Sequence, residues 1–235
     1  MRISVILPAY NEEERIEGAV KMVEEVLGKM NYDYEIIVVD DGSTDGTLTK
    51  ALKCANGNNH VKVVSHQRNL GKGAAVRTGF MHSTGEIIVF MDSDLEISPE
   101  SLPTYVKALK EADIAIGSKW HPQSRVETTL LRKFLSRGFY TLARLLVGVK
   151  VRDTQAGLKA FRREALEKIM KLQLVKHYAF DVELLAIASL LKLKVIELPV
   201  KMKLAAGFRI KDIYKMLVDL LGIAYRLRIK KWYQK

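Results

Sequence analysis

Short apolar segments alternate with longer segments of helical spacing through the first half of this 235-residue chain. Continuous apolar segments are typical of strands that are covered on both faces of a sheet. The pattern predicts strands at Ile3–Leu7, Glu35–Val39, Val61–Ser65, Ile87–Met91 and Ile114–Ile116, and helices at Glu12–Leu27, Thr47–Ala55, Ala74–His82 and Pro99–Lys110. Because strands that alternate with helices form right-handed βαβ units, we predict an α/β fold with a doubly wound, mostly parallel sheet.

Beyond Gly117 the pattern becomes mainly helical. A polar segment, Lys119–Thr129, precedes predicted helices at Leu130–Val147, Glu164–Met170 and Val182–Lys192, a strand at Val195–Val200 and a closing helix over Ile210–Trp232. The first and last of these helices are amphipathic and basic. No apolar run reaches the ~18–20 residues that a membrane-spanning helix needs, so we expect no span.

Charge is distributed unevenly along the chain. Residues 1–118 hold 12 Lys and Arg against 18 Asp and Glu, whereas residues 119–235 hold 26 against 9. Such asymmetry favours an anionic partner, either a membrane surface or nucleic acid, over a merely solvated basic face. The aromatic platforms expected of a nucleic-acid-binding protein are sparse, so we expect no nucleic acid. The single cysteine, Cys54, excludes an intrachain disulfide and fits a reducing compartment such as the cytoplasm.

Aspartates follow two of the predicted strands, and ligands of parallel sheets bind at the carboxyl ends of strands. Asp92-Ser93-Asp94 follows Ile87–Met91 and could hold Mg²⁺ or Mn²⁺, which prefer carboxylate and diphosphate oxygens. The alternative is a loop with a helix cap. Asp40 and Asp41 follow Glu35–Val39 and could bind a base and a ribose, or form a turn with Gly42.

Asn69-Leu70-Gly71-Lys72-Gly73 suggests a phosphate loop. It lacks the spacing of a Walker sequence, and no Gly-x-Gly-x-x-Gly follows the first strand. The sequence therefore supports neither a Walker ATPase nor a standard dinucleotide dehydrogenase. The alternative for the two glycines is a helix that begins close to the sheet.

Taken together, these segments resemble a known family. Pro8-Ala9-Tyr10-Asn11-Glu12, Asp40–Asp45, Asn69–Gly73 and Asp92–Asp94 resemble, in order and spacing, the family-two glycosyltransferases of the GT-A fold. In the second half, Gly117–Lys119, Leu131–Gly138, Asp153–Lys159 and Ala179–Leu184 resemble the polyprenyl-phosphate sugar synthases, and dolichyl-phosphate glucosyltransferases more than mannose synthases. The resemblance covers residues 1–205 and implies a nucleotide-sugar half at 1–118, an acceptor half at 119–205 and a basic amphipathic helix at 206–235.

The resemblance also implies roles for individual residues. The nucleotide-sugar would be bound by Pro8, Tyr10, Glu12, Asp40, Asp41, Lys72 and Ser93, with Lys203 and Arg209 as contacts to its diphosphate. The metal would be held by Asp92, Asp94 and Glu96, the last at a position where mannose synthases carry Gln. The acceptor phosphate would be held by Lys119, Arg132 and Ser136. Asp94, Arg132 and Asp153 are the catalytic candidates, and Asp153 has a turn or cap as its alternative.

The implied reaction is inverting, metal-dependent transfer of a hexose, glucose from UDP-glucose, onto a polyprenyl (dolichyl) phosphate. An acceptor phosphate is already ionised at neutral pH, so catalysis depends on positioning and on stabilising the diphosphate leaving group. Transfer of mannose from GDP-mannose, transfer to a soluble saccharide and a basic nucleic-acid-binding protein are the alternatives. We expect attachment to the cytoplasmic face of a membrane, peripheral or through a membrane-protein partner, with Leu131, Phe134, Leu135 and Leu145 toward lipid.

Overall fold

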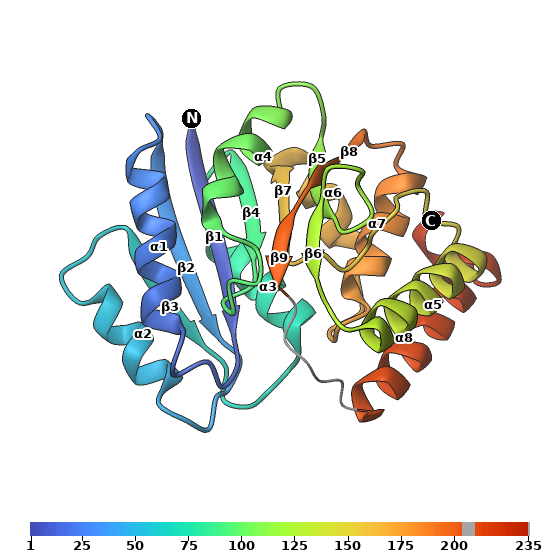
Figure 1. The fold of residues 1–235 in the computed structure, drawn as a ribbon, viewed down its shortest axis with the longest axis horizontal. Helices are drawn as coiled ribbons and strands as arrows, with labels where there is room; N and C mark the ends of the chain where they lie inside the picture. Colours follow the sequence, from blue (N-terminus) through green and yellow to red (C-terminus); the bar gives the residue numbers. More distant parts are fainter. Residues whose placement is uncertain (204–209, 235) are drawn as a thin grey trace.

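The structure is a computed structural model that describes residues 1–203 and 210–234, without the side chains of residues 130–132, 203 and 210–213. A seven-stranded sheet with the order β3-β2-β1-β4-β7-β5-β8 forms its centre (Figure 1). The pairs β1–β2, β2–β3, β1–β4 and β5–β8 are parallel, and only β7 runs against its neighbours. The predicted doubly wound, mostly parallel sheet is therefore confirmed.

The strands of the large sheet are β1 (Arg2–Ala9), β2 (Asp33–Asp40), β3 (Val61–Ser65), β4 (Ile87–Met91), β5 (Ile114–Ser118), β7 (Leu158–Arg162) and β8 (Val195–Pro199). A separate parallel pair joins β6 (Arg125–Glu127) to β9 (Lys201–Lys203). The helices are α1 (Ile16–Gly28), α2 (Thr47–Ala55), α3 (Lys72–His82), α4 (Leu102–Ala108), α5 (Leu130–Val147), α6 (Arg163–Leu172), α7 (Phe180–Leu190) and α8 (Ile210–Arg228), with short 3₁₀ turns at Pro99–Ser101 and Trp232–Gln234.

Helices cover both faces of the large sheet, as its continuously apolar strands require. On one face, α1, α2 and α4 pack in a core around Ile36 and Tyr105. On the other face, α3, α6 and α7 form a second core around Phe161 and Phe180, which α5 and α8 extend with Ala143 and other buried side chains. Because helices cover both faces, a ligand of this sheet would bind at the ends of the strands.

Several local features differ from the sequence prediction. Helix α1 begins at Ile16 rather than at Glu12, because the amide of Glu12 donates to the Thr47 hydroxyl (2.8 Å) and so belongs to a loop. Strands β7 and β9 were not predicted, and β6 lies within Lys119–Thr129, which was predicted only as a polar segment. The closing helix ends at Arg228, short of the predicted Trp232.

The two amphipathic helices of the second half lie side by side (Figure 1). Arg228 of α8 donates a hydrogen bond to the carbonyl of Leu145 in α5 (2.6 Å), which ties the two helices near their C-terminal ends. Within the described part of the chain, no helix combines the length and the apolar content that crossing a bilayer would take.

Candidate active site

The carboxyl ends of β1, β2 and β4 meet at one edge of the sheet, because these strands are parallel neighbours. Two hydrogen bonds join the segments that follow them. The amide of Asp41 donates to the carbonyl of Ala9 (2.8 Å), and the buried Ser93 hydroxyl donates to the carbonyl of Pro8 (2.9 Å). The segments that begin at Pro8, Asp40 and Asp92 are thereby brought together as the sequence predicted. Ser93 has a structural contact here, and its contact with a nucleotide stays a prediction.

The loop after β1 is locked to the loop after β2. Asn11 adopts a left-handed conformation (φ 55°), which Asn tolerates better than most residues. Its side chain accepts a hydrogen bond from the amide of Thr44 (2.9 Å), and its amide donates to the Ser43 hydroxyl (3.0 Å). This interlock leaves Pro8 half-buried and Tyr10 exposed at the rim of the strand ends, where a planar base could lie against the ring.

Asp40 and Asp41 are both buried, yet they have different partners. Asp40 accepts hydrogen bonds from the Ser65 hydroxyl (2.9 Å) and from the amide of Ser43 (3.3 Å). Asp41 accepts bonds from the amides of Leu70 (2.9 Å) and Gly71 (2.8 Å) and contacts the ring of His66 (2.7 Å). Both oxygens of Asp41 are thus used to shape the loop of Asn69–Gly73. Contact of either aspartate with a nucleotide stays a prediction.

Lys72 lies at the first position of α3, and its ammonium is 2.5 Å from the carboxylate of Asp92. Burial by itself would lower the pKa of Lys72, but the carboxylates of Asp92 and Asp181 outweigh it, so the pKa lies above its ordinary value. Lys72 is therefore a permanent cation beside the carboxylates that follow β4. This contact joins the Asn69–Gly73 loop to the predicted metal site.

The pKa values of Asp94 and Glu12 are raised where several carboxylates lie close together. Burial raises the pKa of Asp94 above its ordinary value, and the neighbouring Asp92 raises it further. Burial also raises the pKa of Glu12, although a 2.9 Å ion pair with Arg15 opposes that shift. A divalent cation would relieve this strain between like charges, so the electrostatics of the site fit a bound metal.

The donor set also fits a metal that shares its coordination with substrate. Asp94 accepts a hydrogen bond from the amide of Glu96 (3.0 Å), which shapes the loop after β4. Among the described residues, no three carboxylate, imidazole or thiol groups gather as a complete metal cage. Mg²⁺ and Mn²⁺ commonly take one or two carboxylates and fill the remaining positions with diphosphate and water, so Asp92 and Asp94 suffice. A third contact from Glu96 stays a prediction.

The turn before β7 brings the second half of the chain to the same edge. The amide of Asp92 donates to the carbonyl of Gly157 (3.0 Å), and a Cβ at position 157 would lie 2.3 Å from the Asp92 carboxylate. Only glycine fits so close to that carboxylate. Since β7 pairs with β4, the segment of Asp153 approaches the predicted metal site from the second half of the chain.

Asp153 is almost fully buried at 3% exposure and is paired with Lys119. Its carboxylate accepts the amide of Lys119 (2.9 Å) and the amide of Gln155 (2.9 Å), and the Lys119 ammonium lies 3.6 Å away. These bonds are those of a turn, which was the alternative for Asp153. The same bonds fix Lys119 just after β5, whose carboxyl end lies on the same side of the sheet as that of β4.

Two of the remaining candidates, Arg132 and Ser136, belong to α5. Ser136 is half-buried in this helix. Arg132 is in α5 and Lys203 is in β9, but both side chains lie outside the described residues, as does all of Arg209. Arg137 of α5 stacks on the Trp120 ring at 5.3 Å from its centroid, which places α5 next to Lys119. The structure therefore brings Lys119 and the helix of Ser136 together, and the contacts of Arg132, Lys203 and Arg209 stay predictions.

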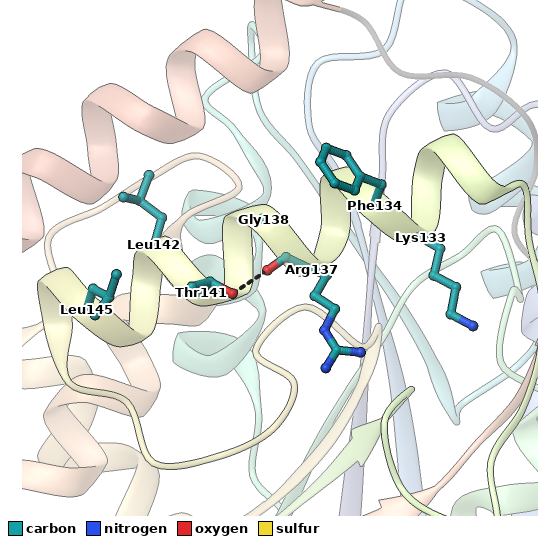
Figure 2. Close-up of a pocket in the computed structure, with 7 residues that line it drawn as sticks. All are labelled: Lys133, Phe134, Arg137, Gly138, Thr141, Leu142 and Leu145. Atoms are coloured by element: carbon teal, nitrogen blue, oxygen red, sulfur yellow. Dashed lines mark hydrogen bonds between the residues drawn. The ribbon is translucent and has the colours of Figure 1, made fainter.

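The outer surface of α5 carries a groove of about 610 Å³, lined by Lys133, Phe134, Arg137, Gly138, Thr141, Leu142 and Leu145 (Figure 2). Lys133 and Arg137 extend from one side of the helix, and Phe134 extends from the other. Phe134 is 77% exposed and Leu145 is 67% exposed. Leu135, which was also expected to face lipid, is half-buried, and the side chain of Leu131 lies outside the described residues.

Sequence reasoning missed a buried ion pair beneath the site. Lys159 of β7 and Asp181 of α7 are both nearly inaccessible and lie 2.7 Å apart. Lys159 also donates to the carbonyl of Ala156 (2.7 Å), in the turn that approaches Asp92. The available signal was a lysine inside the apolar segment Leu158–Phe161, since a buried charge requires a partner.

Comparison with known proteins adds the family context. The family described as Glycosyl transferase family 2 matches residues 4–170. A dolichyl-phosphate beta-glucosyltransferase of Trichomonas vaginalis is 35% identical over 98% of this chain and 75% of its own length. The human dolichyl-phosphate beta-glucosyltransferase is 34% identical over 98% of this chain and 77% of its own.

Solved structures share the fold. Glucosyl-3-phosphoglycerate synthase from Mycobacterium tuberculosis, in a crystal structure with Mn²⁺, UDP-glucose and glycerol 3-phosphate, matches with a TM-score of 0.72 and 23% identity. The match covers 95% of this chain and 79% of that one. At this identity the likeness establishes the architecture of the chain and leaves its ligands to other arguments.

Proposed function

The chain belongs to glycosyltransferase family 2, and we propose that it transfers glucose from UDP-glucose to dolichyl phosphate. The observation that carries this proposal is the 34–35% identity, over 97–99% of the chain, to dolichyl-phosphate beta-glucosyltransferases of several organisms. The geometry supports it, because the acidic strand ends and a basic acceptor-side helix lie at one edge of the sheet. The basic helix would attract the acceptor phosphate directly, and the acidic strand ends would bind the donor diphosphate through a metal.

The donor half would hold the nucleotide-sugar at the ends of β1, β2 and β4. Tyr10 and Asp40 would bind the base and the ribose, and Glu12 would border the same space. Asp92 and Asp94 would hold Mg²⁺ or Mn²⁺ together with the diphosphate. The metal, when bound, supplies positive charge to the leaving diphosphate.

The residues of the chain contribute position and charge rather than a general base. Lys72 provides a second cation next to Asp92, where the leaving diphosphate gains negative charge. Asp153 keeps Lys119 oriented through its amide and its ammonium. Lys119 would hold the acceptor phosphate for attack on the face of the sugar opposite the diphosphate, which gives inversion. Ser136 and Arg132 would complete the phosphate contacts from α5.

The same proposal includes docking at a membrane surface, because the acceptor is a lipid. Phe134 and Leu145 of α5 are exposed, and Lys133 and Arg137 border them with positive charge. Helix α8 presents Tyr214, Val218, Leu221 and Tyr225 to solvent at helical spacing. We call these four residues the α8 stripe. Apolar side chains next to basic ones fit peripheral binding to an anionic lipid surface.

A transfer assay tests the proposal. Purified protein is incubated with Mg²⁺ or Mn²⁺ and either UDP-glucose or GDP-mannose, with and without a short polyprenyl phosphate. We expect lipid-dependent consumption of UDP-glucose that needs the metal and falls by at least about 100-fold in Asp94→Asn, because Asn removes a charged ligand. Glu14→Gln, an exposed carboxylate in the loop before α1, is the matched control.

Other outcomes would change the assignment. Consumption of GDP-mannose instead of UDP-glucose would show that the protein uses the guanine nucleotide-sugar as its donor. Transfer without lipid would show that dolichyl phosphate is not the acceptor. If neither donor is consumed in the presence of lipid phosphate, the proposed reaction fails.

A further inference from the structure

Glu183 is a buried carboxylate that no step of the proposed reaction uses. It lies in α7 with no exposed surface, and one of its oxygens accepts the amides of Leu174 (2.9 Å) and Val175 (2.6 Å). A buried carboxylate needs such partners, and the two amides belong to the loop between α6 and α7. Glu183 therefore sets the shape of that loop.

The other oxygen of Glu183 is held by the C-terminal segment. The Tyr233 hydroxyl donates to it, and Arg226 of α8 approaches it at 3.5 Å. Arg226 also donates to the Tyr233 oxygen (2.8 Å). Burial and the neighbouring Glu183 raise the pKa of Tyr233, so its hydroxyl remains a donor at neutral pH. We call Glu183, Arg226 and Tyr233 the C-terminal clamp.

The loop that Glu183 shapes supports the backbone on both sides of Lys72. The amide of Ala74 donates to the carbonyl of Lys176 (3.1 Å). Gly71 has a φ of 99°, and a Cβ there would lie 2.5 Å from both the Lys176 carbonyl and the His177 ring. A Cβ at Gly73 would lie 2.7 Å from the carbonyl of Val175. The residues that flank Lys72 thus pack directly on the segment of residues 175–177.

Helix α8 reaches the same loop through a second group. Burial raises the pKa of Asp219, while His177 and Arg226 act in the opposite direction. One carboxylate oxygen of Asp219 is buried and has no hydrogen-bond partner among the described residues. Arg226, a member of the clamp, therefore also favours the charged form of Asp219.

From these contacts we infer that the C-terminal clamp positions Lys72 for donor binding, with Glu183 and Tyr233 as positioning residues. The clamp fixes Leu174 and Val175, the following residues support Gly71 and Ala74, and these fix the backbone that aims Lys72 at Asp92. The consequence for catalysis rests on the proposed function, in which Lys72 stabilises the diphosphate of the donor. A looser clamp would weaken donor binding and leave the contacts of Lys119 unchanged.

Hydrogen exchange on the full chain without ligands tests the physical coupling. Tyr233→Phe removes the hydroxyl that donates to Glu183 and keeps the buried ring. We expect amides in residues 70–76 and 173–178 to exchange at least threefold faster, and those of β1 to stay unchanged. Gln234→Ala changes the exposed neighbouring residue and should leave both segments at the wild-type rate. Unchanged exchange over 70–76 in Tyr233→Phe would overturn the inference.

Kinetics then separate positioning from a general loss of stability. In Tyr233→Phe we expect the KM for UDP-glucose to rise by about threefold to tenfold, the range that the loss of one typical intramolecular hydrogen bond would give. The KM for the lipid phosphate should stay within twofold of wild type. Glu183→Gln should likewise raise the KM for UDP-glucose. Equal changes in both KM values would contradict positioning of Lys72. Hydrogen exchange needs no donor, so a wrong donor assignment leaves the coupling test valid.

Discussion

Several charged residues of the site are paired with an opposite charge of the protein itself, and these pairs affect how the site binds its ligands. Asp92 carries the predicted metal role, yet Lys72 already lies 2.5 Å from its carboxylate. Cation binding at Asp92 therefore competes with an ion pair of the protein itself. The diphosphate of a donor would give Lys72 another anionic partner and so release Asp92 for the metal.

The first prediction follows from that competition. Lys72→Met removes the ammonium, so Mn²⁺ should bind the donor-free variant more tightly than wild type, on the order of tenfold for one unit charge at this range. Calorimetry, or the electron paramagnetic resonance of free Mn²⁺, measures the affinity. Lys21→Met alters an exposed lysine of α1 and should bind Mn²⁺ like wild type. An unchanged affinity in Lys72→Met would mean that the ion pair does not compete.

Glu35 shows how a buried charge serves stability at the opposite edge of the sheet. Its carboxylate is inaccessible and contacts the Lys62 ammonium (2.6 Å), the Ser4 hydroxyl (2.7 Å) and the amide of Thr84 (2.6 Å). Burial alone would raise the pKa of Glu35, but these partners together lower it to about 2. The folded state therefore holds the charged form far below the ordinary pKa of a glutamate.

The second prediction is a pH dependence of stability. Because the pKa of Glu35 is lowered in the folded state, its stabilisation is complete above pH 4.5 and is lost as the pH falls toward 2. Glu35→Gln should lower the free energy of unfolding by about 2 kcal/mol at pH 6 and by less at pH 3. Urea unfolding at both pH values measures this. Glu86→Gln, an exposed carboxylate near the same edge, should show little change at pH 6.

At the scale of elements, the sequence predicted the parallel strands well because each is a continuous apolar segment beside a helix. Strand β7 escaped prediction because it is inserted antiparallel between β4 and β5 and carries Lys159, whose partner Asp181 is remote in sequence. The contacts of Asp41 and Ser93 were also not predictable, because their partners are remote in sequence. Their position at strand ends was predictable, whereas their bonds to loop amides and carbonyls depend on how three loops meet.

The third prediction concerns α8 as an interfacial element. Leu221→Ser removes one apolar side chain, 59% exposed, from the α8 stripe. Binding to vesicles of mixed neutral and anionic lipid should weaken by about fivefold to tenfold, since burial of a leucine side chain contributes about 1.5–3 kcal/mol when complete. Vesicle sedimentation measures this.

Its control is Leu52→Ser, which removes a similarly exposed leucine (52%) from α2. That variant should bind vesicles like wild type, because α2 covers the other face of the sheet. Equal loss in both variants would indicate nonspecific contact instead of an α8 surface.

At the scale of the whole molecule, the acidic and basic halves of the chain coincide with the parts proposed to bind the donor and the acceptor. The acidic first half supplies the strand ends of the proposed donor site, and the basic second half supplies α5, α8 and the Lys119 turn. A lipid acceptor would bring its phosphate to the basic side, and an anionic surface would hold the protein there. The metal would allow a negatively charged donor to bind the acidic half.

This division leads to the last prediction, a difference in salt sensitivity between the two ligands. Raising NaCl from 0.05 to 0.5 M should reduce binding to anionic vesicles by at least about tenfold, because exposed charges are screened beyond a few ångströms at high salt. Binding of UDP with Mn²⁺, measured by calorimetry in the same buffers, should change by less than threefold, because its contacts are short and partly buried. Neutral vesicles should show weak binding that salt does not reduce. Vesicle binding that stays constant across this range would mean that the apolar residues of α5 and α8 act without the basic ones, and the charge of the second half would then need another partner.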